Sequence, residues 1–118
     1  MKTSLFTAAL LLAANGALAQ DAINCGSCAE WNQPVKPFNI HGNSYYVGTA
    51  GLSAILVTGP QGHVLLDGAL PQSAPLIQKN IASLGFKMKD VKLILNSHAH
   101  FDHAGGIAAL QEAVSYTH

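Results

Sequence analysis

The segment Asn96–Gly106 constrains this chain more than any other, because it concentrates metal-ligand side chains between a strand and a helix. It reads Asn-Ser-His-Ala-His-Phe-Asp-His-Ala-Gly-Gly and directly follows Val91–Leu95, a strand that we expect to be buried. Its four candidate ligands are His98, His100, Asp102 and His103. The first two lie two residues apart, so an extended backbone points them to the same side. The last two follow at a turn, which can aim them at a neighbouring point, as two adjacent metal ions require.

The donor types of this segment favour zinc. Neutral imidazole and carboxylate both suit Zn²⁺, and a catalytic zinc keeps one coordination position open for water. Zinc lowers the pKa of that water to about 7, which supplies hydroxide without a protein base. Gly105 and Gly106 would let the backbone approach the ions closely. The spacing and the flanking elements argue against a polar surface loop that is merely rich in histidine, so the segment predicts a dinuclear metal hydrolase.

The rest of the chain predicts strands followed by helices. Alternating or β-branched residues indicate strands over Phe38–Ile40, Ser44–Thr49, Ser53–Thr58 and His63–Asp67. The last two strands flank Gly59–Gly62, whose turn residues predict a hairpin. Apolar residues at i, i+4 and i+7 predict a helix over 73–84, with Ser73 as its cap and Gly85 as its stop. With a second helix expected over 106–114, the chain predicts an α/β fold whose helices pack on one face of the sheet.

Residues 1–19 have the three regions of a secretory signal peptide. Lys2 supplies a positive charge, Leu5–Ala14 is an apolar run, and an Ala-x-Ala site ends at Ala19. The run is shorter than the about 20 apolar residues that a membrane span needs. The alternative, a buried N-terminal helix, does not account for all three regions. We therefore expect cleavage after Ala19 and an exported mature chain, residues 20–118, with no membrane segment.

Cys25 and Cys28 follow in the sequence Cys-Gly-Ser-Cys, within a segment (20–37) that we expect to form an extended surface arm. In a cytosolic chain this spacing would suggest a redox dithiol or half of a zinc site. Export to an oxidising compartment favours a disulfide instead. The two cysteines could pair with each other or with a cysteine outside this sequence, and in either case their role is structural.

The charge pattern excludes nucleic acid as a partner. The chain has no arginine, and its six basic residues are all lysines balanced by six acidic residues. Binding to a phosphate backbone needs clustered Arg and Lys, which this chain lacks.

The motif His98-x-His100-x-Asp102-His103 resembles the signature of the metallo-β-lactamase superfamily. Further segments resemble the third subclass of class B β-lactamases: Phe38-x-Ile40, Tyr46–Thr49, Gly51–Ser53, Gly62–Gly68, Asn80–Ile81, Leu84–Phe86 and Asp90–Lys92. The resemblance runs from about Trp31 to about Gln111. It implies a four-layered αβ/βα sandwich of two similar halves, with the metals at the edge between them. This chain would supply about the first half.

The resemblance also implies a chemistry. His98 and His100 would help to hold the first of two zinc ions, while Asp102, a catalytic residue, and His103 would help to hold the second. A metal-bound hydroxide would attack the carbonyl of a β-lactam ring without a covalent enzyme intermediate, and the second zinc would stabilise the departing ring nitrogen. The implied protein is a periplasmic enzyme of antibiotic resistance, with a small-molecule β-lactam as its substrate.

Other polar and aromatic residues carry weaker expectations. By resemblance, Asp67 lies under the metal site, where its carboxylate could orient a ligand, although an aspartate that initiates a turn before Gly68 is an equal alternative. Trp31 could line a substrate groove, but we favour a role in anchoring the arm to the core. His41 and His63 are expected to be structural.

The family needs one further histidine for each zinc, and both would come from strands beyond residue 118. A catalytic zinc usually has three protein ligands, whereas this chain offers two for each ion. Half of a sandwich would also expose an apolar sheet face that promotes association, and Ser115–His118 reads as the start of another strand. We therefore expect the sequence to belong to a longer enzyme, and residues 20–118 alone to bind zinc weakly and to be inactive.

Two alternatives to the β-lactamase remain. The same motif is similar to lactonases that open acyl-homoserine lactones, and to other ester or thioester hydrolases of the superfamily. A catalytically inactive fragment that binds only zinc or a partner is the other. Export and the strand pattern before the motif favour the β-lactamase.

Overall fold

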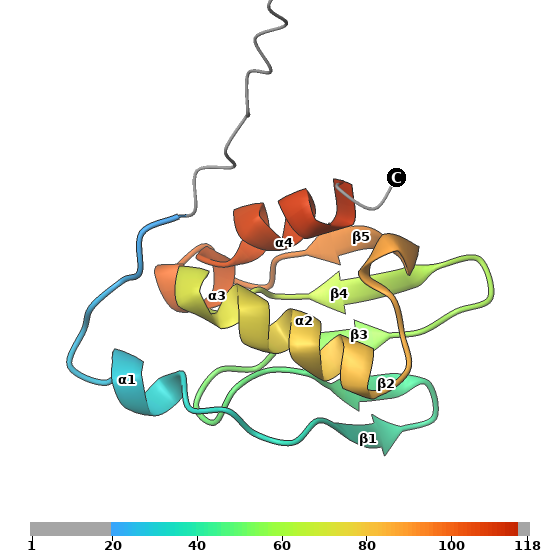
Figure 1. The fold of residues 1–118 in the computed structure, drawn as a ribbon, viewed down its shortest axis with the longest axis horizontal. Helices are drawn as coiled ribbons and strands as arrows, with labels where there is room; N and C mark the ends of the chain where they lie inside the picture. Colours follow the sequence, from blue (N-terminus) through green and yellow to red (C-terminus); the bar gives the residue numbers. More distant parts are fainter. Residues whose placement is uncertain (1–19, 116–118) are drawn as a thin grey trace, which may run out of the picture.

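The computed structural model describes residues 20–115, in which a five-stranded mixed sheet carries its helices on one face (Figure 1). The strands lie in the sheet in the order of the sequence. They are β1 (Phe38–His41), β2 (Ser44–Tyr46), β3 (Ile55–Val57), β4 (His63–Leu66) and β5 (Val91–Leu95). The first four strands form an antiparallel meander, and β5 pairs with β4 in parallel. The proposed signal peptide lies outside the described residues.

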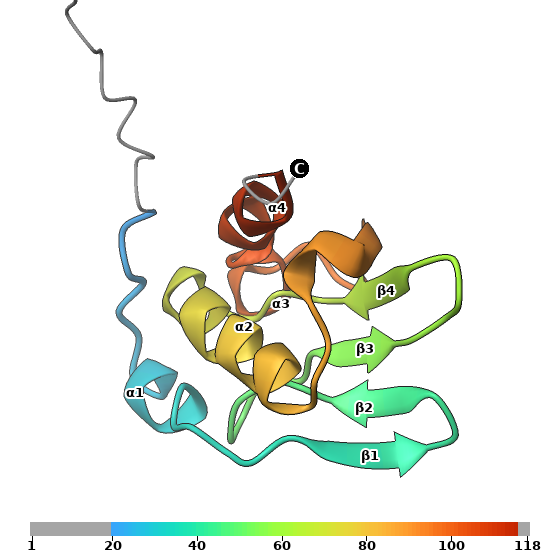
Figure 2. The same cartoon turned by 45° about the vertical axis from the view of Figure 1, so that its right-hand side comes forward.

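The helices are α1 (Cys28–Trp31), α2 (Ala74–Ser83), α3 (Phe101–Ala104) and α4 (Ile107–Ser115), with short 3₁₀ turns at Pro71–Ser73 and Met88–Asp90. Helices α2 and α4 cover the same face of the sheet (Figures 1 and 2). This confirms the α/β arrangement expected from the sequence. Within residues 20–115 no helix is both long and apolar enough to span a bilayer.

The sequence did not predict the two short helices α1 and α3, and it assigned Ser115 to a strand. Helix α1 interrupts the expected extended arm, and α3 lies inside the histidine segment. Ser115 does not begin a strand but ends α4, where its Oγ donates to the carbonyl of Gln111 one helical turn earlier (3.0 Å). The remaining residues of that expected strand, 116–118, lie outside the described part of the chain.

The hydrophobic core lies between the sheet and the helices. Fully buried leucines of the two central strands, Leu56 and Leu65, face Ile77 and Ile81 of α2 and Leu110 of α4. The spacing of Ile77 and Ile81 belongs to the apolar pattern from which the sequence predicted α2. The helix ends where expected, because Gly85 has a φ of +87°, a backbone conformation that glycine adopts without strain.

The opposite face of the sheet is open and apolar. The strand register places on it Phe38, Tyr46, Ile55, Val57, Val64, Leu66, Leu93 and Leu95. The expectation that β5 is buried was wrong, since Leu93 and Leu95 are 49% and 45% exposed. The reason is that helices cover one face of this strand only. The expectation of an exposed apolar sheet face agrees with this arrangement.

The N-terminal arm carries a disulfide of its own, between Cys25 and Cys28 at the start of α1. It is fastened to the body at Ile23, whose amide donates to Gln72 Oε1 (3.0 Å) and whose carbonyl accepts from Gln72 Nε2 (2.7 Å), and at Trp31. The carbonyl of Trp31 accepts hydrogen bonds from the Thr49 hydroxyl (2.7 Å) and the Gly51 amide (3.0 Å), and its ring packs against the core. Trp31 therefore anchors the arm, as the sequence favoured.

Candidate metal site

The histidine segment and Asp67 meet because two parallel strands end side by side. Asp67 follows the last residue of β4, and the histidine segment follows the last residue of β5. The Asp67 amide donates to the Leu95 carbonyl (2.8 Å), which joins the two strand ends directly. The carboxyl ends of neighbouring parallel strands are where α/β proteins place their sites.

The histidine rings of the segment gather at this edge. The ring centroids of His98 and His100 are 4.3 Å apart, and those of His98 and His103 are 5.3 Å apart. The backbone at His100 is extended (φ −68°, ψ 155°), and helix α3 begins immediately after it. His103 and Asp102 both lie on α3, with 3.7 Å between His103 Nε2 and Asp102 Oδ2. The structure thus places His98 near His100 and Asp102 near His103, and metal binding by these four residues stays a prediction.

Glycines hold the loop after β4 against the segment. The Gly68 amide donates to the His103 carbonyl (2.8 Å), and the Gly106 amide donates to the Ala69 carbonyl (3.2 Å). A Cβ on Gly106 would lie 2.1 Å from the Gly68 oxygen, and one on Gly105 would lie 2.4 Å from the Phe101 oxygen. The sequence assigned Gly105 and Gly106 to close contact with metal ions. In the structure their close contacts are to protein backbone.

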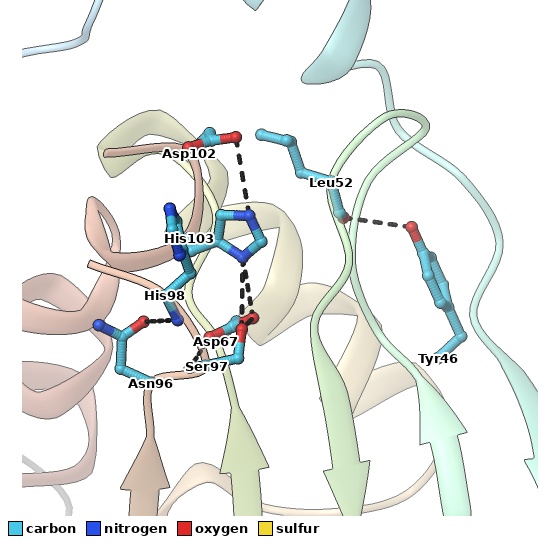
Figure 3. A network of polar contacts seen from close by, with 8 residues as sticks. All are labelled: Tyr46, Leu52, Asp67, Asn96, Ser97, His98, Asp102 and His103. Carbon is cyan, nitrogen blue, oxygen red and sulfur yellow. Dashed lines mark hydrogen bonds and ion pairs between the residues drawn. The ribbon is translucent and has the colours of Figure 1, made fainter. Parts of the chain in front are cut away.

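Asp67 is the centre of a hydrogen-bond network (Figure 3). Its Oδ1 accepts from the Ser97 amide (2.7 Å), and its Oδ2 accepts from the Ser97 hydroxyl (2.5 Å) and from His103 Nδ1 (3.1 Å). Burial by itself raises the pKa of the Asp67 carboxyl, but the hydrogen bonds from Ser97 and the contact with His103 outweigh it and lower the pKa. The Asp67 carboxylate thus holds the His103 ring, and the role of that ring as a metal ligand stays a prediction.

The residues present fit the donor chemistry of zinc but do not complete a site. Asp67 accepts from Nδ1 of His103, which leaves Nε2 of that ring facing Asp102. A histidine held in this way is typical of metal ligands. Among residues 20–115, however, no group of three or more histidine, cysteine, aspartate or glutamate side chains is close enough to hold one ion. Each pair would need at least one more ligand.

Two polar residues of the site were missed by the sequence analysis. Ser97 donates twice to Asp67, and Asn96 accepts a hydrogen bond from the His98 amide through its Oδ1 (3.3 Å). Ser97 carries no local signal, since its partner lies 30 residues away. Away from the site, His63 packs edge-on against Phe86 and accepts a hydrogen bond from the Gly59 amide, which agrees with the structural role expected for it.

A shallow, open groove of about 490 Å³ borders the histidine segment, and none of the four candidate ligands lines it. Its walls come from the N-terminal arm (Gln20, Asp21, Ile23), from Pro71 and from the histidine segment (Ala99, Phe101, Ala104, Gly105). Phe101 is 44% exposed here.

Comparisons with known proteins agree with this fold. The family model of the metallo-beta-lactamase superfamily matches residues 47–118. The solved structure of Rm3 metallo-beta-lactamase is 60% identical over 79% of this chain, with a TM-score of 0.75, and this chain covers 35% of it. MEM-A1, a subclass B3 metallo-beta-lactamase from a soil metagenome library, is 60% identical over 72% of this chain, with a TM-score of 0.71, and is covered to 32%.

Curated relatives include the N-acyl homoserine lactonase AttM of Rhizobium radiobacter, which is 33% identical over 98 residues. The match covers 77% of this chain and 36% of the lactonase. The chain thus spans about a third of the length of the relatives and structures that it matches.

A mixed sheet with helices on one face, and a His-x-His-x-Asp-His segment at its strand ends, define a candidate metal centre of an α/β protein. The chain belongs to the metallo-β-lactamase superfamily. It covers part of a metallo-β-lactamase fold, and its structural neighbours are subclass B3 enzymes.

Proposed function

We propose that this chain belongs to a zinc-dependent β-lactamase of the subclass B3 type, which opens the β-lactam ring of antibiotics by hydrolysis. The observation that carries the proposal is 60% identity to two solved metallo-β-lactamases over 79% and 72% of the chain. The identity to the curated lactonase is 33%. The candidate ligands lie together at one sheet edge, which supports the same proposal.

In this proposal the four candidate ligands act as two pairs. His98 and His100 would hold one zinc ion, and Asp102 and His103 would hold the other. When bound, the ions would supply Lewis acidity and lower the pKa of water at the site. Asp67 would keep the His103 ring oriented, because it accepts from Nδ1 and leaves Nε2 free.

Asp102 has the additional role of placing a carboxylate beside the reacting centre. Its Oδ2 lies 3.7 Å from His103 Nε2, so the carboxylate and the imidazole ring lie next to each other at the edge of the site. The groove along the N-terminal arm is the part of the described chain that would receive the β-lactam.

Opening of an acyl-homoserine lactone is the second candidate function. It rests on the match to AttM, an N-acyl homoserine lactonase, over 77% of this chain. Both reactions would use the same ligands, because each opens a cyclic carbonyl compound with water. The substrate therefore distinguishes them, and the metal does not.

We further propose that activity belongs to a longer protein and that this chain alone is inactive. Each zinc has two candidate ligands among residues 20–115, whereas catalytic zinc usually has three. We also propose a periplasmic location, based on the signal-peptide pattern of residues 1–19.

The test compares two substrates with and without metal. The longer protein is assayed with a chromogenic cephalosporin and with an acyl-homoserine lactone, before and after treatment with a chelator. We expect cephalosporin turnover that the chelator abolishes and that added zinc restores. Preferential opening of the lactone would establish the second candidate, and turnover that survives complete zinc removal would exclude a metal mechanism.

A matched pair of variants ties this activity to the site. His98→Ala removes a proposed ligand, whereas His63→Ala removes a histidine that packs against Phe86 away from the site. We expect the first variant to lose activity and the second to keep it. Equal losses would show that the histidine segment has no special role.

A further inference from the structure

We propose that Ser97 is a positioning residue: its hydroxyl holds the Asp67 carboxylate so that the His103 ring keeps its proton on Nδ1 and presents Nε2 for a metal. The inference rests on the proposed metal site. It adds a residue to that site, one step behind the carboxylate that contacts the histidine (Figure 3).

The first step of the argument is that Ser97 holds both oxygens of Asp67. The Ser97 amide donates to Oδ1 (2.7 Å), and the Ser97 hydroxyl donates to Oδ2 (2.5 Å). Asp67 is 6% exposed, so water has little access to replace these donors. The carboxylate therefore has one orientation, and Ser97 sets it.

The backbone of Asp67 points to the same conclusion. Its φ of +65° lies in the left-handed region, which residues other than glycine rarely adopt. Such a conformation persists only where the surroundings determine it. Here the Asp67 amide is bound to the Leu95 carbonyl and the side chain is bound to Ser97. The unusual backbone aims the carboxylate at the segment after β5.

The second step is that Asp67 fixes the proton of His103. A carboxylate only accepts hydrogen bonds, so His103 Nδ1 must donate across the 3.1 Å contact. In the neutral ring Nε2 then carries the lone pair. The Gly68 amide also binds the His103 carbonyl (2.8 Å), so the backbone and the ring of this residue are held from the same loop.

The hydroxyl of Ser97 decides between two arrangements. Its oxygen lies 2.5 Å from Asp67 Oδ2 and 3.4 Å from His103 Nδ1. Because it has a single proton and gives it to Asp67, it does not donate to the ring. A donor to Nδ1 would favour the opposite tautomer, with the proton on the nitrogen that the metal needs.

A structural role alone would not need the hydroxyl. The Ser97 amide already joins the ends of β4 and β5 through Asp67 Oδ1. Ser97→Ala keeps this amide contact and removes only the hydroxyl, whereas Ser97→Thr keeps both. The pair therefore separates positioning of the ring from joining of the strands.

The test consists of two measurements, one on the metal-free chain and one with zinc. The ring nitrogens of ¹⁵N-histidine in the metal-free chain are followed by NMR at about pH 8, where an ordinary imidazole is neutral. Zinc affinity is measured by competition with a chromophoric chelator. Ser83→Ala serves as the control, because it removes a serine hydroxyl bound to the Asn80 carbonyl on α2.

We expect His103 to be an Nδ1–H tautomer in the wild-type chain, in Ser97→Thr and in Ser83→Ala. In Ser97→Ala, Asp67 Oδ2 loses the hydroxyl that holds it opposite His103 Nδ1, so we expect the carboxylate to turn partly away from the ring. The expected result is a mixture of tautomers and a loss of zinc affinity of about tenfold, the lower end for residues that support a ligand. If Ser97→Ala keeps the wild-type tautomer, the proposal is wrong.

The two readings separate this proposal from the proposed function. If the longer protein that completes the ligand pairs binds no zinc at all, the proposed metal site fails, and the tautomer of His103 still decides the role of Ser97. If zinc binds equally well to the wild type and to Ser97→Ala, the role of Ser97 is refuted while the metal site stands.

Discussion

The contact between Gly106 and the loop after β4 gives the sharpest prediction for the fold. In the Gly106→Ala variant the added Cβ would lie 2.1 Å from the Gly68 oxygen and 2.7 Å from the Leu70 oxygen. Ordinary carbon contacts are about 3.5 Å or longer, so the loop must move by more than about 1 Å. Gly106 is not among the glycines with positive φ, so the change tests close packing and not backbone strain.

The size of the effect follows from two contributions. Overpacking costs about 1–3 kcal/mol and occasionally more, and a contact with backbone belongs at the upper end. Displacing the loop also weakens the hydrogen bonds from Gly68 to His103 and from Gly106 to Ala69, each worth about 0.5–1.5 kcal/mol. We expect Gly106→Ala to lose about 3–5 kcal/mol of unfolding free energy.

Thermal unfolding, followed by far-ultraviolet circular dichroism, measures this loss. For a domain of this size about 1 kcal/mol corresponds to about 4–8 °C, so we expect the Tm to fall by at least about 12 °C. Gly26→Ala is the matched control, since a Cβ there meets nothing within 4 Å. A Gly106→Ala variant whose stability is within about 1 kcal/mol of the control would refute the reasoning.

Three further changes test other parts of the structure. Asn80→Leu removes the amide that donates to the Val47 and Gly48 carbonyls (3.0 Å each), and we expect urea denaturation to show a loss of about 2 kcal/mol or more; an unchanged midpoint would contradict this. Leu93→Lys places a charge on the open sheet face, where Leu93 is 49% exposed, so light scattering of the chain should show less self-association, and unchanged association would point to another surface. Tyr46→Phe removes the hydroxyl that donates to the carbonyls of Thr49 and Leu52. We expect this variant to lose about 1 kcal/mol of unfolding free energy. Burial raises the pKa of the Tyr46 phenol, and a hydrogen bond with Ser53 lowers it by a smaller amount. The protonated phenol therefore stabilises the fold below about pH 10, and this stability is lost as the pH rises through the raised pKa. The difference in unfolding free energy between the wild type and Tyr46→Phe should shrink in the same range. A difference that stays constant to higher pH would show that the phenol does not titrate with unfolding.

The sequence was sufficient for elements whose side chains repeat regularly. The bounds of β5 and the position of α2 followed from local periodicity, and Gly85 marked the end of that helix. The short helices α1 and α3 were missed because four residues are too few to show a helical period. The exposure of β5 was also missed, since a run of apolar residues does not show how many faces of its sheet are covered.

The candidate site was likewise predicted only in part from the sequence. The spacing of His98, His100, Asp102 and His103 was visible locally, and the structure brings these residues into two pairs. The network behind them was not visible, because Ser97 meets Asp67 across 30 positions in the sequence. Asp67 also has a left-handed backbone (φ +65°), which aspartate adopts more often than most residues but which its sequence position alone does not predict.

The central claim is that the histidine segment is a zinc site, and ring-nitrogen NMR of the ¹⁵N-histidine-labelled longer protein, which supplies the ligands that this chain lacks, tests it most directly during a zinc titration. We expect the ring signals of His98, His100 and His103 to move together as zinc is added. The signals of His41 and His63, which lie on the strands β1 and β4 away from the segment, should stay in place. Zinc-dependent shifts at His41 and His63 with none in the segment, or no response from any of the three segment histidines, would contradict the account.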